Sequence, residues 1–146
     1  MAARGALHLR RGAVVALIAL LGSAAAACGQ PPPAGRITTD DAALHQDITE
    51  GRSGAEVTFG GVVVSGPTVY GREQEFRVRT PVGDQLEVDH DIDYATSAPV
   101  HQDAQVIVRG QLYLDPGRVG VHCTHQSTSS GCPVPGFVEY GGRLYE

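Results

Sequence analysis

Apolar and charged residues alternate strictly in two short segments in the middle of the chain. Residues 75–80, EFRVRT, and residues 85–90, QLEVDH, each carry two apolar side chains two positions apart, with charged residues between and beside them. A period of two predicts β-strands with one buried face, and the residues PVGD between the two segments predict a hairpin. The side chains expected to face inward are Phe76, Val78, Leu86 and Val88.

Three further segments have strand patterns, with turn residues between them. Residues 55–66 contain Gly60-Gly61 in their middle, and paired glycines inside a strand predict a bulge or a sharp bend. Residues 104–115 and 118–123 are predicted to form strands around the turn dipeptide PG. The connection at 91–103 is predicted to be irregular or a single helical turn.

A short helix is predicted ahead of the strands, over residues 38–51. The segment TTDDAALHQDITEG offers a threonine cap, acidic residues in the first turn and Gly51 as the stop. Its apolar side is narrow and consists of Ala43, Leu44 and Ile48.

A second hairpin is predicted in the tail, FVEYGGRLYE, because a two-glycine loop separates two alternating segments. The expected register pairs Tyr140 with Arg143 and Val138 with Tyr145. A cation–π contact between Arg143 and Tyr140 would then stabilise the hairpin by ~0.5–1 kcal/mol.

The order of these elements predicts an all-β fold with one small helix on its N-terminal side. A bent first strand, a meander and a crossing connection favour a five-stranded OB-like barrel with a C-terminal hairpin. A β-sandwich is the alternative, but it would need about seven strands.

The N-terminal segment has the features of an export signal, so the fold is expected in residues 38–146 only. Residues 1–27 combine three arginines with an apolar stretch that is too short to span a bilayer. The run AAAC ending at Cys28 resembles a bacterial lipoprotein signal, with alanine at position 25 where leucine is usual; an ordinary secretion signal is the alternative. Residues 28–37 would then be a lipidated cysteine and a proline-rich tether, which predicts an exported protein, anchored on the outer side of the cell membrane or free outside the cytoplasm.

Charge argues against nucleic acid as a partner. The three arginines of residues 1–27 leave with the signal, so the remaining chain carries 8 arginines against 16 acidic residues and no lysine. A net charge of −8 repels a phosphate backbone. The partners predicted instead are the membrane, through Cys28, and a small ligand or an envelope protein.

The three cysteines fit the predicted compartment. Thiols of exported proteins tend to pair, and if Cys28 carries lipid, Cys123 and Cys132 remain. A structural disulfide between these two is favoured over a redox pair or a metal site, because their spacing is not C-x-x-C.

One group of polar residues is the candidate site: His90, Asp91, Asp93, His122 and His125. Imidazoles and carboxylates suit Zn²⁺ or another divalent transition metal, with His90, His122 and His125 as its ligands. The two later histidines are three apart, so they converge only if the chain turns at Cys123-Thr124. The alternative is structural: Asp91 and Asp93 form a turn, and His90 bonds a backbone carbonyl.

Three segments together resemble a family of small exported bacterial proteins, the domain of unknown function 3465. They are VDHDIDYA (88–95), VHCTH (121–125) and PGFVEYGGRLY (135–145). Matching residues are His90, Asp91, Ile92, Asp93, His122, Thr124, His125, Gly136, Phe137, Tyr140 and Tyr145. This chain departs from the family pattern at Cys123, Gln126 and Glu73-Gln74, which removes imidazoles. The resemblance implies a fold and a site for residues 40–146 and no assigned activity.

Three functions are compatible with these patterns. A non-enzymatic binding module of the cell envelope is favoured, and no cofactor is expected for it. A metal-dependent hydrolase or nuclease-like enzyme using the His/Asp cluster is the second hypothesis, and a purely structural envelope lipoprotein is the third. Fold by analogy does not choose among them.

Overall fold

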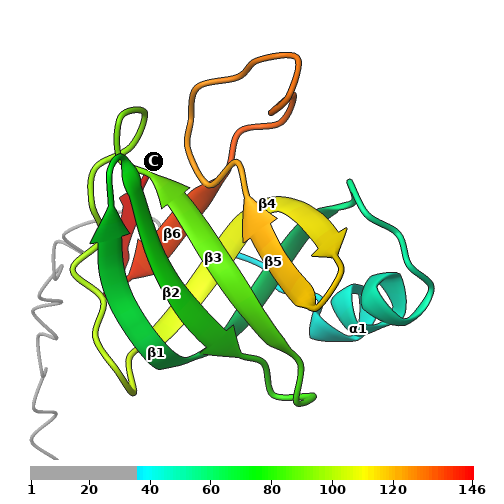
Figure 1. The fold of residues 1–146 in the computed structure, drawn as a ribbon. Helices are drawn as coiled ribbons and strands as arrows, with labels where there is room; N and C mark the ends of the chain where they lie inside the picture. The colour runs from blue at the N-terminus through cyan, green and yellow to red at the C-terminus, as the bar shows by residue number, and fades with distance from the viewer. Residues whose placement is uncertain (1–35) are drawn as a thin grey trace, which may run out of the picture. The chain divides into compact units, whose positions relative to one another are not determined.

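The alternating segments form a closed ring of five strands in a computed structural model, which describes residues 36–146 (Figure 1). These residues lie within one compact unit, Ala34–Glu146. The predicted signal segment, Cys28 and almost all of the tether lie outside the described residues. In the part of the chain that is described, no helix has the length and hydropathy needed to cross a membrane.

The described chain has one helix and seven strands. They are α1 (Asp41–Thr49), β1 (Glu56–Tyr70), β2 (Glu73–Arg79), β3 (Gln85–Asp91), β4 (Gln105–Asp115), β5 (Arg118–His122), β6 (Phe137–Tyr140) and β7 (Arg143–Tyr145). The strand order is β1-β2-β3-β5-β4-β6-β7, and an additional β1–β4 pairing closes the first five strands into the ring. All neighbouring pairs are antiparallel except β3 and β5, which run parallel.

The core lies inside the ring and contains the side chains that the alternation predicts. Phe76, Val78, Leu86 and Val88 are all at most 2% exposed, which confirms their inward orientation. The same alternation continues on β1 and β4, so every ring strand contributes apolar side chains to one interior. The main contributors from these two strands are Val57, Phe59, Val63, Val106, Val108 and Leu112.

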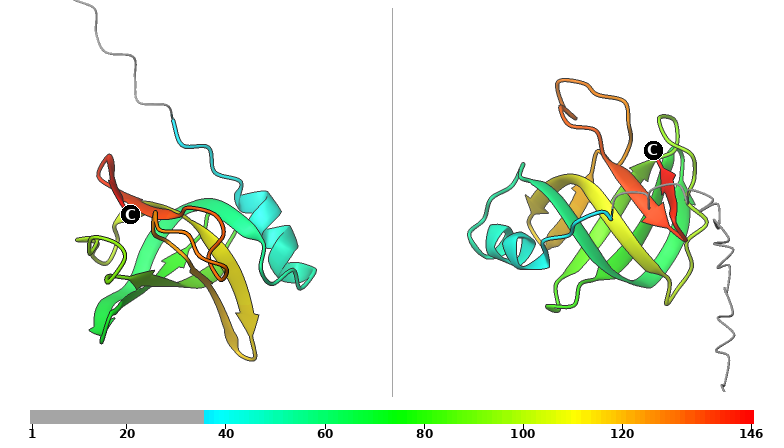
Figure 2. Two further views of the ribbon diagram at one scale, coloured as in Figure 1. Left: turned by 90° about the horizontal axis from the view of Figure 1, so that it is seen from above. Right: turned by 180° about the vertical axis from the view of Figure 1, so that it is seen from behind.

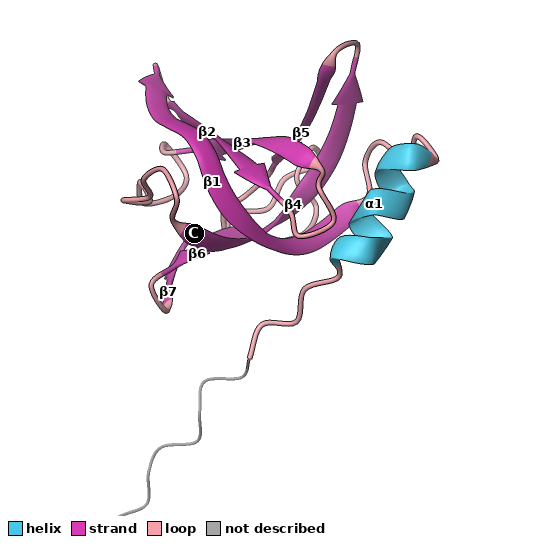
Figure 3. Cartoon of the chain, turned by 90° about the horizontal axis from the view of Figure 1, so that it is seen from below, coloured by secondary structure: helices cyan, strands magenta, loops and turns pink. Residues whose placement is uncertain are grey.

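Strand β1 pairs with a different strand on each side, because it is long and curves around the ring (Figure 3). Its first half pairs with β4 and its second half with β2, and Val62 pairs with both. A Cβ atom on Gly61 would lie 2.5 Å from the carbonyl oxygen of Arg79, so glycine permits the close approach of β1 and β2. The predicted bulge is elsewhere: register shifts occur between Val63 and Thr68, after the two glycines.

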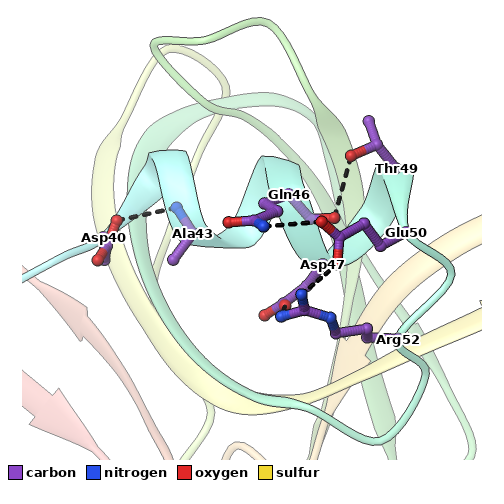
Figure 4. Close-up of polar contacts among 7 residues, drawn as sticks. All are labelled: Asp40, Ala43, Gln46, Asp47, Thr49, Glu50 and Arg52. Atoms are coloured by element: carbon purple, nitrogen blue, oxygen red, sulfur yellow. Dashed lines mark hydrogen bonds and ion pairs between the residues drawn. The ribbon is translucent and has the colours of Figure 1, made fainter.

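Helix α1 confirms the predicted short helix, but its cap differs from the expected threonine (Figure 4). The Asp40 carboxylate accepts a hydrogen bond of 2.9 Å from the Ala43 amide, because an aspartate side chain satisfies a free N–H at a helix start. Leu44 is the buried residue of the helix, and Ile48 packs beside it. After the helix, Arg52 forms ion pairs with Asp47 and Glu50.

The tail hairpin has the predicted register, with Val138 opposite Tyr145 and Tyr140 opposite Arg143. Strand β6 also pairs with β4, beside which it lies in both views of Figure 2. The expected cation–π partner is wrong: the Arg143 guanidinium lies 5.4 Å from the ring centre of Tyr145. The Tyr140 hydroxyl instead donates a hydrogen bond of 3.0 Å to His101 Nε2.

Candidate functional site

The parallel strands β3 and β5 end at the same side of the ring, where the loop after β5 extends outward (Figure 1). This places segment 90–94 and segment 122–132 close together. The five predicted site residues all come from these segments, but their side chains enter three different surroundings. The interior of the ring, the outer face of the sheet and a pocket under the β5–β6 loop each receive some of them.

His90 lies inside the ring and has no exposed surface. Its Nε2–H donates to the Thr96 carbonyl at 3.0 Å, and its Nδ1 accepts from the Thr124 hydroxyl at 2.8 Å. Burial lowers the pKa of His90 below its ordinary value, in agreement with this neutral tautomer. Both ring nitrogens are therefore used in holding the protein together.

Gln74 lies opposite His90 across the β2–β3 pair and is also buried. Its side chain donates to the Ala98 carbonyl at 2.8 Å and accepts from the Ala98 amide at 2.9 Å. Together His90 and Gln74 attach the 92–103 connection to the ring at two points. The irregular connection predicted at 91–103 is thus fixed by two buried polar side chains.

His122 faces outward and joins a cluster of ionisable groups on β3, β4 and β5. Its Nε2–H donates to Gln111 at 3.2 Å, and its ring meets the Tyr113 ring edge-on with centres 5.8 Å apart. Burial lowers the pKa of His122 below its ordinary value. It lines a cavity of about 330 Å³ together with Asp89, Tyr113, Asp115 and Arg118.

Asp89 is the most perturbed carboxyl of this outer cluster. Burial raises its pKa to about 6 from an ordinary value of 3.8, and the negative charges of Glu87 and Glu75 act in the same direction. Its Oδ1 atom is buried and has no hydrogen-bond partner among the described residues. Ionised Asp89 is therefore a destabilising group at neutral pH.

Glu87, the neighbouring outward carboxyl on β3, is held ionised. Burial acts to raise its pKa, but the hydrogen bond and charge of Arg118 outweigh that effect and lower it below its ordinary value. Arg77 lies 3.4 Å from the same carboxylate, and the Tyr113 hydroxyl donates to it at 3.2 Å. The two carboxyls of this face thus have opposite preferences for the proton.

His125 lies in the third surrounding, a pocket of about 310 Å³ between the end of β3 and the β5–β6 loop. Asp91, Tyr94, His125, Cys132 and residues 127–129 line this pocket. His125 is only 7% exposed, and its ring centre is 5.3 Å from that of Tyr94. Its Nδ1 is buried and has no hydrogen-bond partner among the described residues.

The carboxylate of Asp91 is fixed at the rim of the same pocket. Its Oδ1 accepts from the Asp93 amide at 3.0 Å, and its Oδ2 lies 3.7 Å from Arg72 Nε. The Asp93 side chain itself is exposed and lines none of these cavities. Asp91 therefore forms the turn after β3 and also presents a carboxylate to the pocket.

The pocket wall is a loop closed by covalent and hydrogen bonds. The sulfur atoms of Cys123 and Cys132 lie 2.04 Å apart, at the bonding distance of a disulfide, as predicted. The Ser129 hydroxyl accepts from the amides of Gly131 and Cys132, and the Ser129 amide donates to the Cys132 carbonyl at 2.9 Å. These bonds restrict the conformations that are open to the loop.

The chain does turn where the two later histidines required it. Cys123 has a φ of 57°, in the left-handed region that non-glycine residues seldom adopt. A Cβ atom on Gly136 would lie 2.1 Å from the Cys123 carbonyl oxygen, so only glycine fits where the loop returns to the ring. Even so, His122 and His125 line different cavities.

The predicted metal ligands are thus not brought together. His90 is engaged inside the ring, His122 is on its outer face, and His125 is in the loop pocket. Within residues 36–146, no group of three His, Cys, Asp or Glu side chains is arranged to hold a metal ion.

Sequence reasoning overlooked several residues of these sites, among them Tyr94, Asp89, Tyr113 and Arg118. Asp89 and Tyr94 lie within the segment that carried the family resemblance, so their positions were available as a signal. Tyr113 and Arg118 meet Asp89 only because β3 runs beside β5 and β5 beside β4, which no local pattern encodes.

A comparison of the chain with protein-family models and with curated proteins finds no match. The resemblance to the domain of unknown function 3465 accordingly stays a prediction.

Proposed function

We propose that this protein is an exported binding module of the bacterial cell envelope, built on an OB-type barrel and held at the membrane by a lipid on Cys28. The ring of five strands closed by the β1–β4 pairing supports the OB-type assignment, since such barrels have five strands. The ligand site is the loop pocket, lined by Asp91, Tyr94, His125, Cys132 and residues 127–129.

The observation that carries the binding function is the composition and rigidity of the loop pocket. Its volume of about 310 Å³ is at the lower end of the range for ligand sites. Its wall is held by the Cys123–Cys132 bond and by Ser129, so a ligand meets a surface that is already ordered. Preorganisation of this kind reduces the entropy lost on binding.

The placement of the site is tested by nuclear magnetic resonance on the ¹⁵N-labelled mature protein, which lacks the signal segment. A chemically mixed fragment library should contain binders whose largest shifts fall on the amides of Tyr94, His125 and residues 127–129. Binders whose shifts fall instead at the larger cavity around Gly60, Gly61 and Arg79 would overturn this placement.

Export and anchoring are tested separately, in a bacterial host that produces the whole chain. The wild-type protein should fractionate with membranes, and its intact mass should include the lipid. Cys28→Ala should move the protein to the soluble fraction. Cys132→Ser, which also removes one cysteine but leaves position 28 unchanged, serves as the control and should stay with membranes. Unchanged membrane association of Cys28→Ala would refute the lipid anchor.

A further inference from the structure

We infer that the ligand of the loop pocket is a neutral, hydroxyl-rich sugar unit of a carbohydrate chain. This inference rests on the proposed function and specifies the class of ligand for the same site. It follows from the donors and acceptors that the pocket presents, from one exposed aromatic ring and from the charge of the lining.

The first argument is the aromatic ring at the pocket rim. Tyr94 is 56% exposed although it lines a pocket and its ring packs against His125. A planar ring exposed beside polar groups offers an apolar face to a ligand that is otherwise polar. Sugar rings have such a dual character, because their C–H groups form an apolar face and their hydroxyls surround it.

The second argument is the set of hydrogen-bonding groups. Asp91 supplies carboxylate oxygens as acceptors, and His125 adds an imidazole ring whose Nδ1 has no hydrogen-bond partner among the described residues. The Ser129 hydroxyl already accepts two backbone N–H groups, so its own proton remains available to donate. Ser127 and Thr128 add two further hydroxyls to the lining. A ligand that both donates and accepts at several adjacent positions matches this set.

The third argument is charge. No arginine lines the pocket, so the lining lacks the group that usually holds a phosphate or an acidic sugar. Its one carboxylate, Asp91, would attract a basic peptide only weakly, because Arg72 already lies 3.7 Å from that carboxylate. Hydroxyl and imidazole groups outnumber the single paired charge, which favours a neutral sugar over a cationic side chain.

The test is calorimetric titration of the mature protein, which lacks the signal segment, with two neutral probes: the tetramers of N-acetylglucosamine and of glucose. Saturable binding of at least one of them is expected. Tyr94→Ala should weaken it by roughly tenfold or more, the loss expected for an aromatic contact of about 1.4 kcal/mol. Tyr70→Ala is the matched control, because Tyr70 is 64% exposed and lies outside the pocket; it should leave binding unchanged.

The charge argument has its own variant. Asp91→Asn keeps an oxygen that can accept from the Asp93 amide and removes the negative charge. Sugar binding should weaken by roughly threefold to tenfold, because a neutral amide oxygen accepts a weaker hydrogen bond than a carboxylate, and any binding of tetralysine should fall more steeply. Each variant is titrated at a temperature at which its melting curve shows it to be folded, so that loss of folding is not mistaken for loss of a contact.

The outcomes separate this inference from the proposed function. If neither sugar binds, or if binding ignores Tyr94→Ala, the sugar inference is overturned. If tetralysine binds in a Tyr94-dependent manner while the sugars do not, the pocket is a ligand site of different chemistry and the proposed function stands. If no probe and no library fragment shifts the amides of the pocket, both fall.

Discussion

Asp89→Asn should stabilise this protein at pH 8, although it removes a charged residue from the surface of a sheet. Burial raises the pKa of Asp89 to about 6, so the native state holds a proton on this carboxyl more tightly than the unfolded chain, where the pKa is 3.8. The folded state therefore loses stability as the pH rises from about 3.8 through about 6. Asparagine has nearly the same shape and is neutral at every pH, so it avoids this loss.

The magnitude follows from the pKa difference. A change from 3.8 to about 6 corresponds to about 3 kcal/mol at pH values above 6, at about 1.4 kcal/mol for each pH unit. Solvent reaches part of the carboxyl, and screening reduces the expected effect to about 1–2 kcal/mol. At pH 4 the wild-type carboxyl is protonated in the native state, so the two proteins should differ little.

The assay is urea unfolding of the two proteins between pH 4 and pH 8, followed by far-ultraviolet circular dichroism with the disulfide intact. The difference in unfolding free energy should grow across the window from about 4 to about 6 and then level off. Asp93→Asn is the matched control, because it removes the same charge from an exposed side chain and should change stability by less than about 0.5 kcal/mol. A difference for Asp89→Asn that is absent at pH 8, or that does not vary with pH, would refute the reasoning.

Three further predictions concern stability measured by the same urea assay at pH 7. His90→Leu should cost about 2–4 kcal/mol, because it removes both hydrogen bonds of a fully buried imidazole. A loss below about 0.5 kcal/mol would contradict this structural role. Replacing Cys123 and Cys132 together by serine should lower the free energy of unfolding by about 2–3 kcal/mol, because the unfolded chain gains entropy when the loop is no longer closed. Reducing the disulfide of the wild-type protein should lower it by the same amount, and unequal losses would contradict this explanation. Gly61→Ala should lower the free energy of unfolding by more than about 2 kcal/mol, because the added Cβ atom would lie 2.5 Å from the Arg79 carbonyl oxygen of β2. Gly60→Ala should not have this effect, since no atom lies nearer than 3.8 Å to its Cβ position. Equal effects at the two glycines would show that the stability change comes from strand propensity and not from the close approach of the strands.

The secondary structure could be predicted from the sequence because its signals are local. Inward positions such as Phe76 and Val88 are specified by a period of two, and the tail hairpin is specified by two adjacent glycines. The pairing of cysteines followed from their number and spacing. Two contacts were predicted wrongly: Asp40 rather than a threonine caps α1, and Arg143 packs on Tyr145 rather than on Tyr140. In both cases several neighbouring residues could make the same contact, and only the geometry of the chain selects one.

The sites depended on contacts between residues far apart in the chain, which only the tertiary structure decides. The sequence alone determined that His90, His122 and His125 would lie near the ends of two strands. The closed ring decided that His90 meets Thr124, that His122 joins Asp89 and Tyr113 outside, and that His125 lies beside Tyr94. The physical reason is that the orientation of a side chain at a strand end depends on where the backbone turns, here at the left-handed Cys123. Ring closure by β1 and β4 and the parallel pairing of β3 with β5 are likewise set by packing of the whole core.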